Sequence, residues 1–115
     1  MALHYNLEKV HAISENDADF VMSILKLFVE DIPQDFIQMK EAIKEKRHEE
    51  AYSIAHKIKP SIDLLGMIIA YDEIICIENW SRKKGKKKEI KDTYKSLEHH
   101  LEKAIKEIKK DFNLS

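Results

Sequence analysis

Residues that break helices are scarce in this chain of 115 residues, which contains two glycines and two prolines. Apolar residues recur every three or four positions, which is the spacing of one face of an α-helix. Charged residues make up 36% of the chain and lie between the apolar ones, so we expect long helices with charged outer faces. The sequence therefore predicts an all-α protein. The clearest apolar stripe lies near the C-terminus and consists of Ile90, Tyr94, Leu97, Leu101, Ala104 or Ile105, Ile108 and Phe112.

The first half of the chain shows shorter helical patterns. A short N-terminal helix is expected around Tyr5 to Ile13, and Ser14 and Asp17 together resemble the capped start of the next helix. Pro33 is expected to interrupt that helix and to begin a second one that reaches about Lys46, because proline suits the first turn of a helix. The apolar positions expected before this interruption are Phe20, Ile24, Leu27, Phe28 and Ile32.

The second half continues the pattern. A third helix is expected to begin near His48 and to break at Gly66, and a fourth helix is expected from about Met67 to Lys83. The basic run Arg82–Lys88 is expected to form the turn before the last helix. The residues that the third helix is expected to bury are Ala51, Ala55, Ile58, Ile62 and Leu65.

Connections between these helices are short, which forces consecutive helices to run in opposite directions. We therefore expect a single domain, residues 1–115, folded as an up-and-down antiparallel four-helix bundle with an additional N-terminal helix packed on it. Because the apolar stripes are used inside the bundle, we expect a monomer.

Composition excludes several classes of function. The formal net charge of -1 gives no general attraction to nucleic acid or to an anionic membrane. Cys76 is the single cysteine, so no disulfide framework or cysteine-based zinc site is expected, and Cys76 itself is expected to be buried. The N-terminus does not resemble a secretory signal, and the longest apolar stretch falls far short of the roughly 20 residues that span a bilayer. We expect a soluble, cytoplasmic protein, and the sequence leaves open whether it is free-standing or part of a longer chain.

His56 is the residue whose position most suggests chemistry. A helix advances by about 100° per residue, and with Ala51 at zero the buried positions of the third helix cluster near zero. His56 then falls at about 140°, Tyr52 at about 100° and Lys59 at about 80°. His56 is therefore expected to face solvent, with Lys59 as its neighbour one turn further on.

Pro60, four residues after His56, lacks the N–H group that the His56 carbonyl would normally accept. Two explanations remain open. The bundle could tolerate a bend at this position, or a compact side chain could keep the approach to His56 clear.

The segment Ala55-His56-Lys57-Ile58-Lys59-Pro60-Ser61, followed by Leu65-Gly66, resembles the signature of histidine-containing phosphotransfer (HPt) domains of two-component phosphorelays. That signature runs Ala-His, an aliphatic residue, Lys, a small residue and Ser, with Leu-Gly at the same offset. The resemblance covers about Tyr5 to Phe112. The departure is Pro60, where the family more often has glycine or another small residue. Outside the signature, residues similar to those of the family are Phe28, Pro33, Ile77-Glu78, Arg82 and Gly85.

The resemblance implies that His56 accepts a phosphoryl group from a phospho-aspartate of a receiver domain and passes it to another. Lys59 would offset the phosphoryl charge, Pro60 and Gly66 would set the local geometry, and Gly66 would allow the next helix to pack closely. The expected partners are response-regulator receiver domains or a hybrid sensor histidine kinase, with neither nucleic acid nor membrane involved. No metal or other cofactor is expected on this chain, since Mg²⁺ would belong to the receiver. The protein would be a stoichiometric carrier without kinase activity of its own, and no second base is expected to orient His56.

Three alternatives stay open at this stage. The chain could be an interaction module that docks or sequesters a response regulator without being phosphorylated. The lysine run could be a solvated turn, or it could steer acidic receivers toward the protein. Exposed apolar residues, Ile37 or others of the first long helix, could form the docking surface. His99 and His100 point about 100° apart on a helix and are not expected to chelate a metal.

Overall fold

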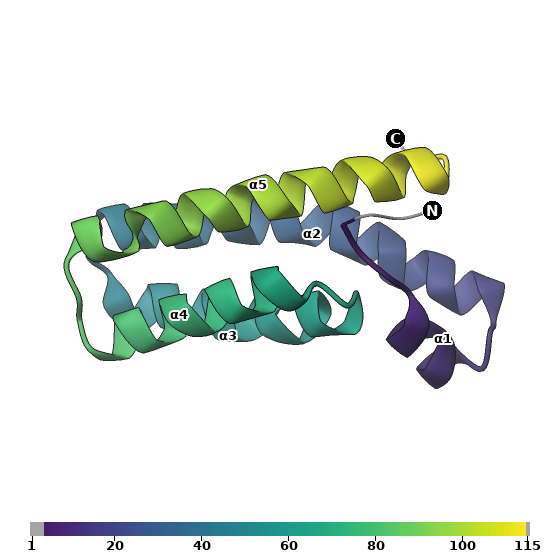
Figure 1. Cartoon of the computed structure of the whole chain (residues 1–115), viewed down its shortest axis with the longest axis horizontal. Coiled ribbons are helices and arrows are strands. Elements are labelled where there is room, and N and C mark those ends of the chain that lie inside the picture. The colour runs from purple at the N-terminus through teal and green to yellow at the C-terminus, as the bar shows by residue number, and fades with distance from the viewer. Residues whose placement is uncertain (1–3, 115) are drawn as a thin grey trace.

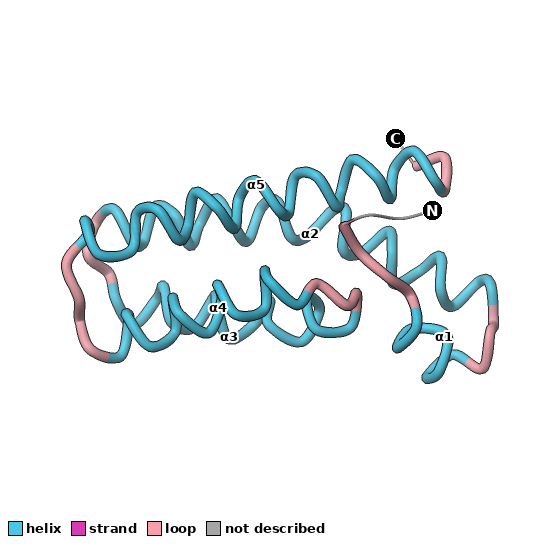
Figure 2. The backbone as a smooth tube through the Cα atoms, viewed as in Figure 1, coloured by secondary structure: helices cyan, strands magenta, loops and turns pink. Residues whose placement is uncertain are grey.

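The computed structural model describes residues 4–114, and this part of the chain forms five α-helices and no strand. Residues 1–3 and 115 of the predicted domain lie outside the described residues. The all-α prediction is confirmed, and the helix bounds lie close to the expected ones in the second half of the chain. The helices are α1 (Glu8–Ser14), α2 (Ala18–Lys44), α3 (His48–Leu64), α4 (Ile68–Arg82) and α5 (Lys87–Asp111) (Figures 1 and 2).

The helices form a compact, elongated bundle with extents of 43 × 23 × 20 Å. Helix α3 packs on both α2 and α4, and α5 packs on both α4 and α2, so these four helices enclose a common core. Figure 1 shows the long helices α2 and α5 lying side by side, with α3 and α4 together on one side of them. Helix α1 packs against α2 beyond the end of α3 and α4 (Figure 1).

Helix α2 is continuous through Pro33, so the prediction that this proline begins a new helix is wrong. The cap at the helix start is formed by Asp17, whose carboxylate accepts hydrogen bonds from the backbone N–H groups of Asp19 and Phe20 at 3.0 and 3.2 Å. Ser14, which was also expected at this start, is the last residue of α1. A proline inside a helix costs about 3 kcal/mol relative to alanine. The buried residues on both sides of Pro33 offset that cost by anchoring the two halves of α2 in one core. They are Val29, Ile32, Phe36 and Met39.

The core is built from the helix faces, and the predicted stripes of α3 and α5 are confirmed except at Phe112, which is half-buried and follows the last residue of α5. Ala51, Ala55, Ile58, Ile62 and Leu65 are buried, as are the α5 residues Ile90, Tyr94, Leu97, Leu101, Ala104 and Ile108. Within the described part of the chain, no helix has both the length and the apolar character that crossing a membrane would require.

Helices α2 and α4 each expose residues that were expected to be buried. Phe28 and Ile32 of α2 are buried as predicted, but Phe20 and Leu27 are exposed (44% and 58%), because Val21 and Leu25 occupy the inward face beside them instead. Cys76 of α4 is exposed, so the prediction of a buried thiol is wrong. Its neighbours Ile74 and Ile77 occupy the inward face, and Cys76 falls outside that face.

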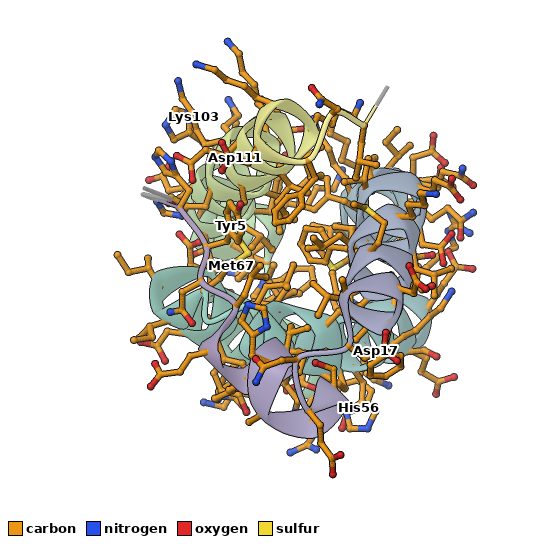
Figure 3. All side chains as sticks on the ribbon, turned by 90° about the vertical axis from the view of Figure 1, so that its right-hand side faces the viewer. Tyr5, Asp17, His56, Met67, Lys103 and Asp111 are labelled. Atoms are coloured by element: carbon orange, nitrogen blue, oxygen red, sulfur yellow. The ribbon has the colours of Figure 1, made fainter. Side chains whose placement is uncertain are left out.

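Gly66 forms the turn between α3 and α4 with φ of +65°, a left-handed conformation that side chains other than glycine rarely adopt. The N-terminal segment crosses this turn, and the Asn6 N–H donates to the Leu65 carbonyl at 2.8 Å. A Cβ atom at Gly66 would lie 2.4 to 2.6 Å from side-chain atoms of Asn6. The N-terminal segment, and not the next helix as expected, is therefore what packs closely against Gly66. The same segment is tied to α5 by the Tyr5 hydroxyl, which donates to Asp111 at 2.8 Å (Figure 3).

We predict that Gly66→Ala lowers the free energy of unfolding by about 1–2 kcal/mol, the cost of a left-handed residue that carries a Cβ. Urea denaturation followed by circular dichroism would measure the change. Ser53→Ala, at an exposed position within α3, is the control and should leave the unfolding midpoint close to that of the wild type. Equal midpoints for Gly66→Ala and the wild type would contradict this account of the turn.

Candidate functional site

His56 lies on the outer surface of α3, as the helical angles predicted, and 62% of its side chain is exposed. Its neighbours Ala55 and Ile58 are buried on the inward face of α3, which fixes the helix against the core and leaves His56 on the outside. Figure 3, which looks along the bundle, shows the His56 ring at the outer edge of the molecule, pointing away from the core. A molecule in solution can therefore reach the imidazole.

A buried carboxylate from α4 holds the inner side of this ring. Glu78 is 5% exposed, and its two oxygens have different partners on α3. His56 Nδ1 lies 3.0 Å from Oε2, and Lys59 Nζ donates to Oε1 at 2.9 Å. The expectation that no second group orients His56 is therefore wrong. Glu78 holds the ring and the ammonium of Lys59 in fixed positions relative to each other.

Charge is balanced inside this cluster. Burial by itself raises the pKa of Glu78. The hydrogen bonds from Lys59 and His56, together with the positive charge of these two residues, have a larger opposite effect, so the pKa of Glu78 lies below its usual value. The hydrogen bond to Glu78 raises the pKa of Lys59 above its usual value, against a smaller opposite effect of desolvation. Glu78 is thus an anion and Lys59 a cation at neutral pH. The positive charge expected beside His56 is present, and it is paired with a carboxylate.

The hydrogen bond from His56 to Glu78 decides which ring nitrogen is the nucleophile. An ionised carboxylate only accepts hydrogen bonds, so Nδ1 must carry the proton. In the neutral ring the lone pair then lies on Nε2. A ring held in one tautomer by a carboxylate at Nδ1 is an arrangement that suits a histidine for nucleophilic attack through Nε2.

Tyr52 and Arg82 extend the site toward one end of the bundle. The rings of Tyr52 and His56 stack with centroids 5.8 Å apart and an interplanar angle of 11°. Arg82 Nη2 donates to the Tyr52 hydroxyl at 2.6 Å, and its guanidinium carbon lies 4.9 Å from the centre of the tyrosine ring. The site therefore combines Tyr52, His56 and Lys59 from one face of α3 with Glu78 and Arg82 from one face of α4.

Pro60 and Gly66 are not part of this cluster. Pro60 is exposed, and α3 continues past it to Leu64, so it does not end the helix. Gly66 lies beyond the end of α3, ten residues after His56, in the turn that Asn6 covers. Gly66 therefore contributes to the shape of the α3–α4 turn.

The apolar residues considered for docking fall on two different surfaces. Ile37 lines a groove between α2 and α5 together with Leu101 and Ile105, away from the α3–α4 face that holds the site. Leu27 lines a groove between α2 and α3 together with Lys57, the residue next to His56. The α2–α3 groove therefore lies on the helix that carries His56, about 100° round α3 from the His56 side chain.

The remaining histidines do not assemble into a cluster with metal-ligand character. His100 Nδ1 lies 2.8 Å from Glu73, and His99 lies edge-on to His100 with ring centroids 6.0 Å apart. Among residues 4–114, no group of three or more histidine, cysteine, aspartate or glutamate side chains could hold a metal ion.

Glu78 is the site residue whose role was missed from the sequence. A signal for it exists, because Glu78 shares the inward face of α4 with Ile74, Ile77 and Ser81. A carboxylate on a buried helix face requires a hydrogen-bonded or charged partner. The helical angles also placed Tyr52 on the same flank of α3 as His56, without predicting the ring stacking.

Comparison of the chain with protein-family models, with curated proteins and with solved structures gave no match. What the protein can do is inferred from the chemistry of the residues described above.

We predict that neutral His56 carries its proton on Nδ1, because Glu78 accepts a hydrogen bond from that atom. Long-range ¹H–¹⁵N correlation spectra at alkaline pH report the tautomer directly. Glu78→Ala should shift His56 toward the Nε2-protonated form. Glu73→Ala removes the matching carboxylate beside His100 and should leave the His56 signals unchanged. A wild-type His56 protonated on Nε2 would contradict the arrangement described here.

Proposed function

We propose that this protein is a histidine phosphotransfer domain, in which His56 carries a phosphoryl group between aspartates of receiver domains. The observation that carries the proposal is the exposed imidazole whose Nδ1 is held by the buried carboxylate of Glu78, with Lys59 on the other carboxylate oxygen. The segment Ala55–Ser61 that contains it resembles the HPt signature. Connections of three or four residues between helices that pack in sequence order support the up-and-down antiparallel course that this proposal includes.

In the proposed transfer, the attacking nitrogen Nε2 carries no proton and does not have to lose one. The lone pair of Nε2 attacks the phosphorus of an aspartyl phosphate on the partner, and an N–P bond forms. The P–O bond to the partner's carboxyl group breaks, and its electron pair leaves with the carboxylate. Because the ring proton is on Nδ1, Nε2 attacks without first losing a proton. The return transfer to a second aspartate follows the same path in reverse.

Glu78 would act on the phosphorylated ring as well. With phosphorus on Nε2 and a proton on Nδ1, the ring carries a positive charge, which the carboxylate 3.0 Å away balances. When the phosphoryl group departs, the ring leaves as a neutral imidazole, which is a better leaving group than an imidazole anion. We therefore assign Glu78 as a positioning residue that keeps the phosphorylated ring ready for transfer.

Lys59 and Arg82 would balance the charge that the phosphoryl group adds. Lys59 Nζ is bound to the same carboxylate as His56 and remains charged because its pKa is raised. Phosphoryl transfer depends mainly on positioning the reacting groups and on neutralising their charge. Lys59, Arg82 and the partner protein together can supply both. The Mg²⁺ ion would belong to the receiver, and this chain would act as a stoichiometric carrier in the cytoplasm without kinase activity.

We place receiver docking on the face formed by α2 and α3. Leu27 is 58% exposed there, and the groove that it lines contains Lys57, which follows His56 in the sequence and lies about 100° further round α3. An exposed apolar groove on the helix that carries the reactive group is a candidate interaction surface for a partner that also covers His56. Ile37, which was considered from the sequence, lies in the α2–α5 groove and is assigned no part in docking.

Phosphoryl transfer from labelled receiver domains tests the proposal directly. Label should move to the wild-type protein in an acid-labile form, and His56→Gln should abolish that transfer while the helical circular dichroism stays the same. His99→Gln, at an exposed position of α5, should transfer like the wild type. Binding of a receiver without any transfer to the wild type would favour the alternative of a docking module that is never phosphorylated.

Two substitutions at Glu78 separate its hydrogen bond from its charge. Glu78→Gln retains a group that can accept from Nδ1, and Glu78→Ala removes both the acceptor and the charge. We predict a transfer rate that falls roughly tenfold in Glu78→Gln, equivalent to about 1.4 kcal/mol, and further in Glu78→Ala. Rapid-quench measurement of phosphohistidine formation at saturating receiver gives the rates. Unchanged rates in both variants would show that Glu78 has no part in transfer.

A further inference from the structure

One end of the bundle is strongly basic although the whole chain is close to neutral. Six of the seven residues from 82 to 88 are lysine or arginine, and all six are exposed: Arg82, Lys83, Lys84, Lys86, Lys87 and Lys88. The α2–α3 connection, with Lys46 and Arg47, lies at the same end (left in Figure 1). Lys84 lines a common depression with Lys46, Arg47, Glu49 and Glu50, so the two connections are adjacent. Arg47 is paired with Glu50 at 2.7 Å and with Glu45 at 3.5 Å, so the excess positive charge at this end comes from residues 82–88. The six basic residues from Arg82 to Lys88 are called the basic end below.

The connection that carries most of this charge is anchored to the core. Trp80, which is 7% exposed, donates from its indole Nε1 to the Lys86 carbonyl at 2.8 Å, and the Gly85 N–H donates to the Trp80 carbonyl at 3.1 Å. A Cβ atom at Gly85 would lie 2.4 Å from the indole ring, so the backbone of this connection rests directly on Trp80.

Further contacts fix the same connection to α3 and to α5. His48 Nε2 donates to the Gly85 carbonyl at 3.0 Å, and its ring lies 4.8 Å from that of Trp80. Glu89 accepts from the Lys86 N–H at 2.6 Å, so its carboxylate is used within the connection. A loosely solvated turn would need none of these contacts. The lysines are therefore attached to a backbone whose position is set before any partner arrives, which lowers the cost of ordering on binding.

The basic end adjoins the phosphoacceptor site. Arg82 belongs to both, because it donates to Tyr52, whose ring stacks on His56. His48, which contacts Gly85, precedes His56 by eight residues on the same helix, a distance of about 12 Å along the axis. This separation exceeds the screening length of about 8 Å at physiological ionic strength, so the lysines act only weakly on the phosphoryl group itself. A partner domain that docks over His56 extends beyond this distance, so its own surface comes within range of the lysines.

We propose that the basic end is the electrostatic recognition surface for an acidic protein partner, which it attracts and orients so that the partner's aspartyl phosphate meets His56. This inference rests on the proposed function and adds the chemistry of the partner surface. An aspartyl phosphate in a magnesium-binding pocket is surrounded by carboxylates, so its rim is complementary to clustered lysines. The continuity of the basic end with His56 through Arg82 favours such a partner over nucleic acid or a membrane. The chain's net charge of -1 provides no general attraction to those polyanions.

Charge reversal tests the proposal. The variant Lys83→Glu/Lys84→Glu/Lys87→Glu changes the basic end and leaves Arg82, Glu78 and His56 intact. Its control, Lys103→Glu/Lys109→Glu/Lys110→Glu, changes the net charge equally on exposed residues of α5, near the opposite end of the chain's last helix (Figure 3 labels Lys103). Thermal unfolding of both variants checks that they fold.

The second-order rate constant of transfer from phosphorylated receivers should decrease with added sodium chloride in the wild type. We expect the basic-end variant to lose roughly tenfold or more of this rate constant at low salt and to lose most of the salt dependence. The rate at saturating receiver should stay unchanged, and the control variant should keep the salt dependence of the wild type. Equal losses in the two variants, or a salt-independent wild type, would overturn the proposal.

Equilibrium binding to unphosphorylated receivers separates this inference from the proposed function. If no label is transferred to the wild type, weaker binding of the basic-end variant than of the control still supports the recognition surface. Binding to phosphatidylserine vesicles or to duplex DNA at least as tight as to the receivers, and lost in the same variant, would assign the basic end to a different partner and overturn the inference.

Discussion

The buried carboxylate of Glu78 is the interaction on which the rest of the site depends. Its two oxygens bind His56 Nδ1 and Lys59 Nζ, so one side chain fixes the tautomer of the imidazole and the position of the neighbouring cation. A carboxylate buried without partners would be costly, and these two partners keep its pKa below the usual value despite burial. The consequence is an exposed Nε2 lone pair beside a fixed positive charge.

The packing of α3 against α4 makes this interaction possible. The buried stripe of α3 and the inward face of α4, with Ile74 and Ile77, set the distance between the two helices. Residues 56 and 59 of α3 then face residue 78 of α4, and residue 52 faces residue 82 one turn further along. The same two helices carry His48 and Trp80, which anchor the basic connection. One helix interface thus supports His56, the charge balance around it and the adjoining lysines.

Much of the fold followed from the sequence because helical periodicity reports directly on burial. The stripes of α3 and α5 and the exposure of His56 were predicted correctly for that reason. Periodicity failed where apolar residues of a helix lie on more than one face, so Phe20 and Leu27 were expected in the core although Val21 and Leu25 occupy it. Periodicity also does not show whether the packing of residues on both sides of Pro33 outweighs the cost of a proline inside the helix. Glu78 was missed because its role depends on the distance between two helices, which spacing within one helix does not contain.

The central claim is that Nε2 of His56 becomes phosphorylated while Nδ1 keeps its proton on Glu78. The most direct measurement is ¹⁵N–³¹P coupling in the ring of His56 after the protein has been phosphorylated by a receiver or by phosphoramidate. The account predicts coupling to Nε2 and a proton on Nδ1 of the same ring. Phosphorus on Nδ1, or on any residue other than His56, would contradict it.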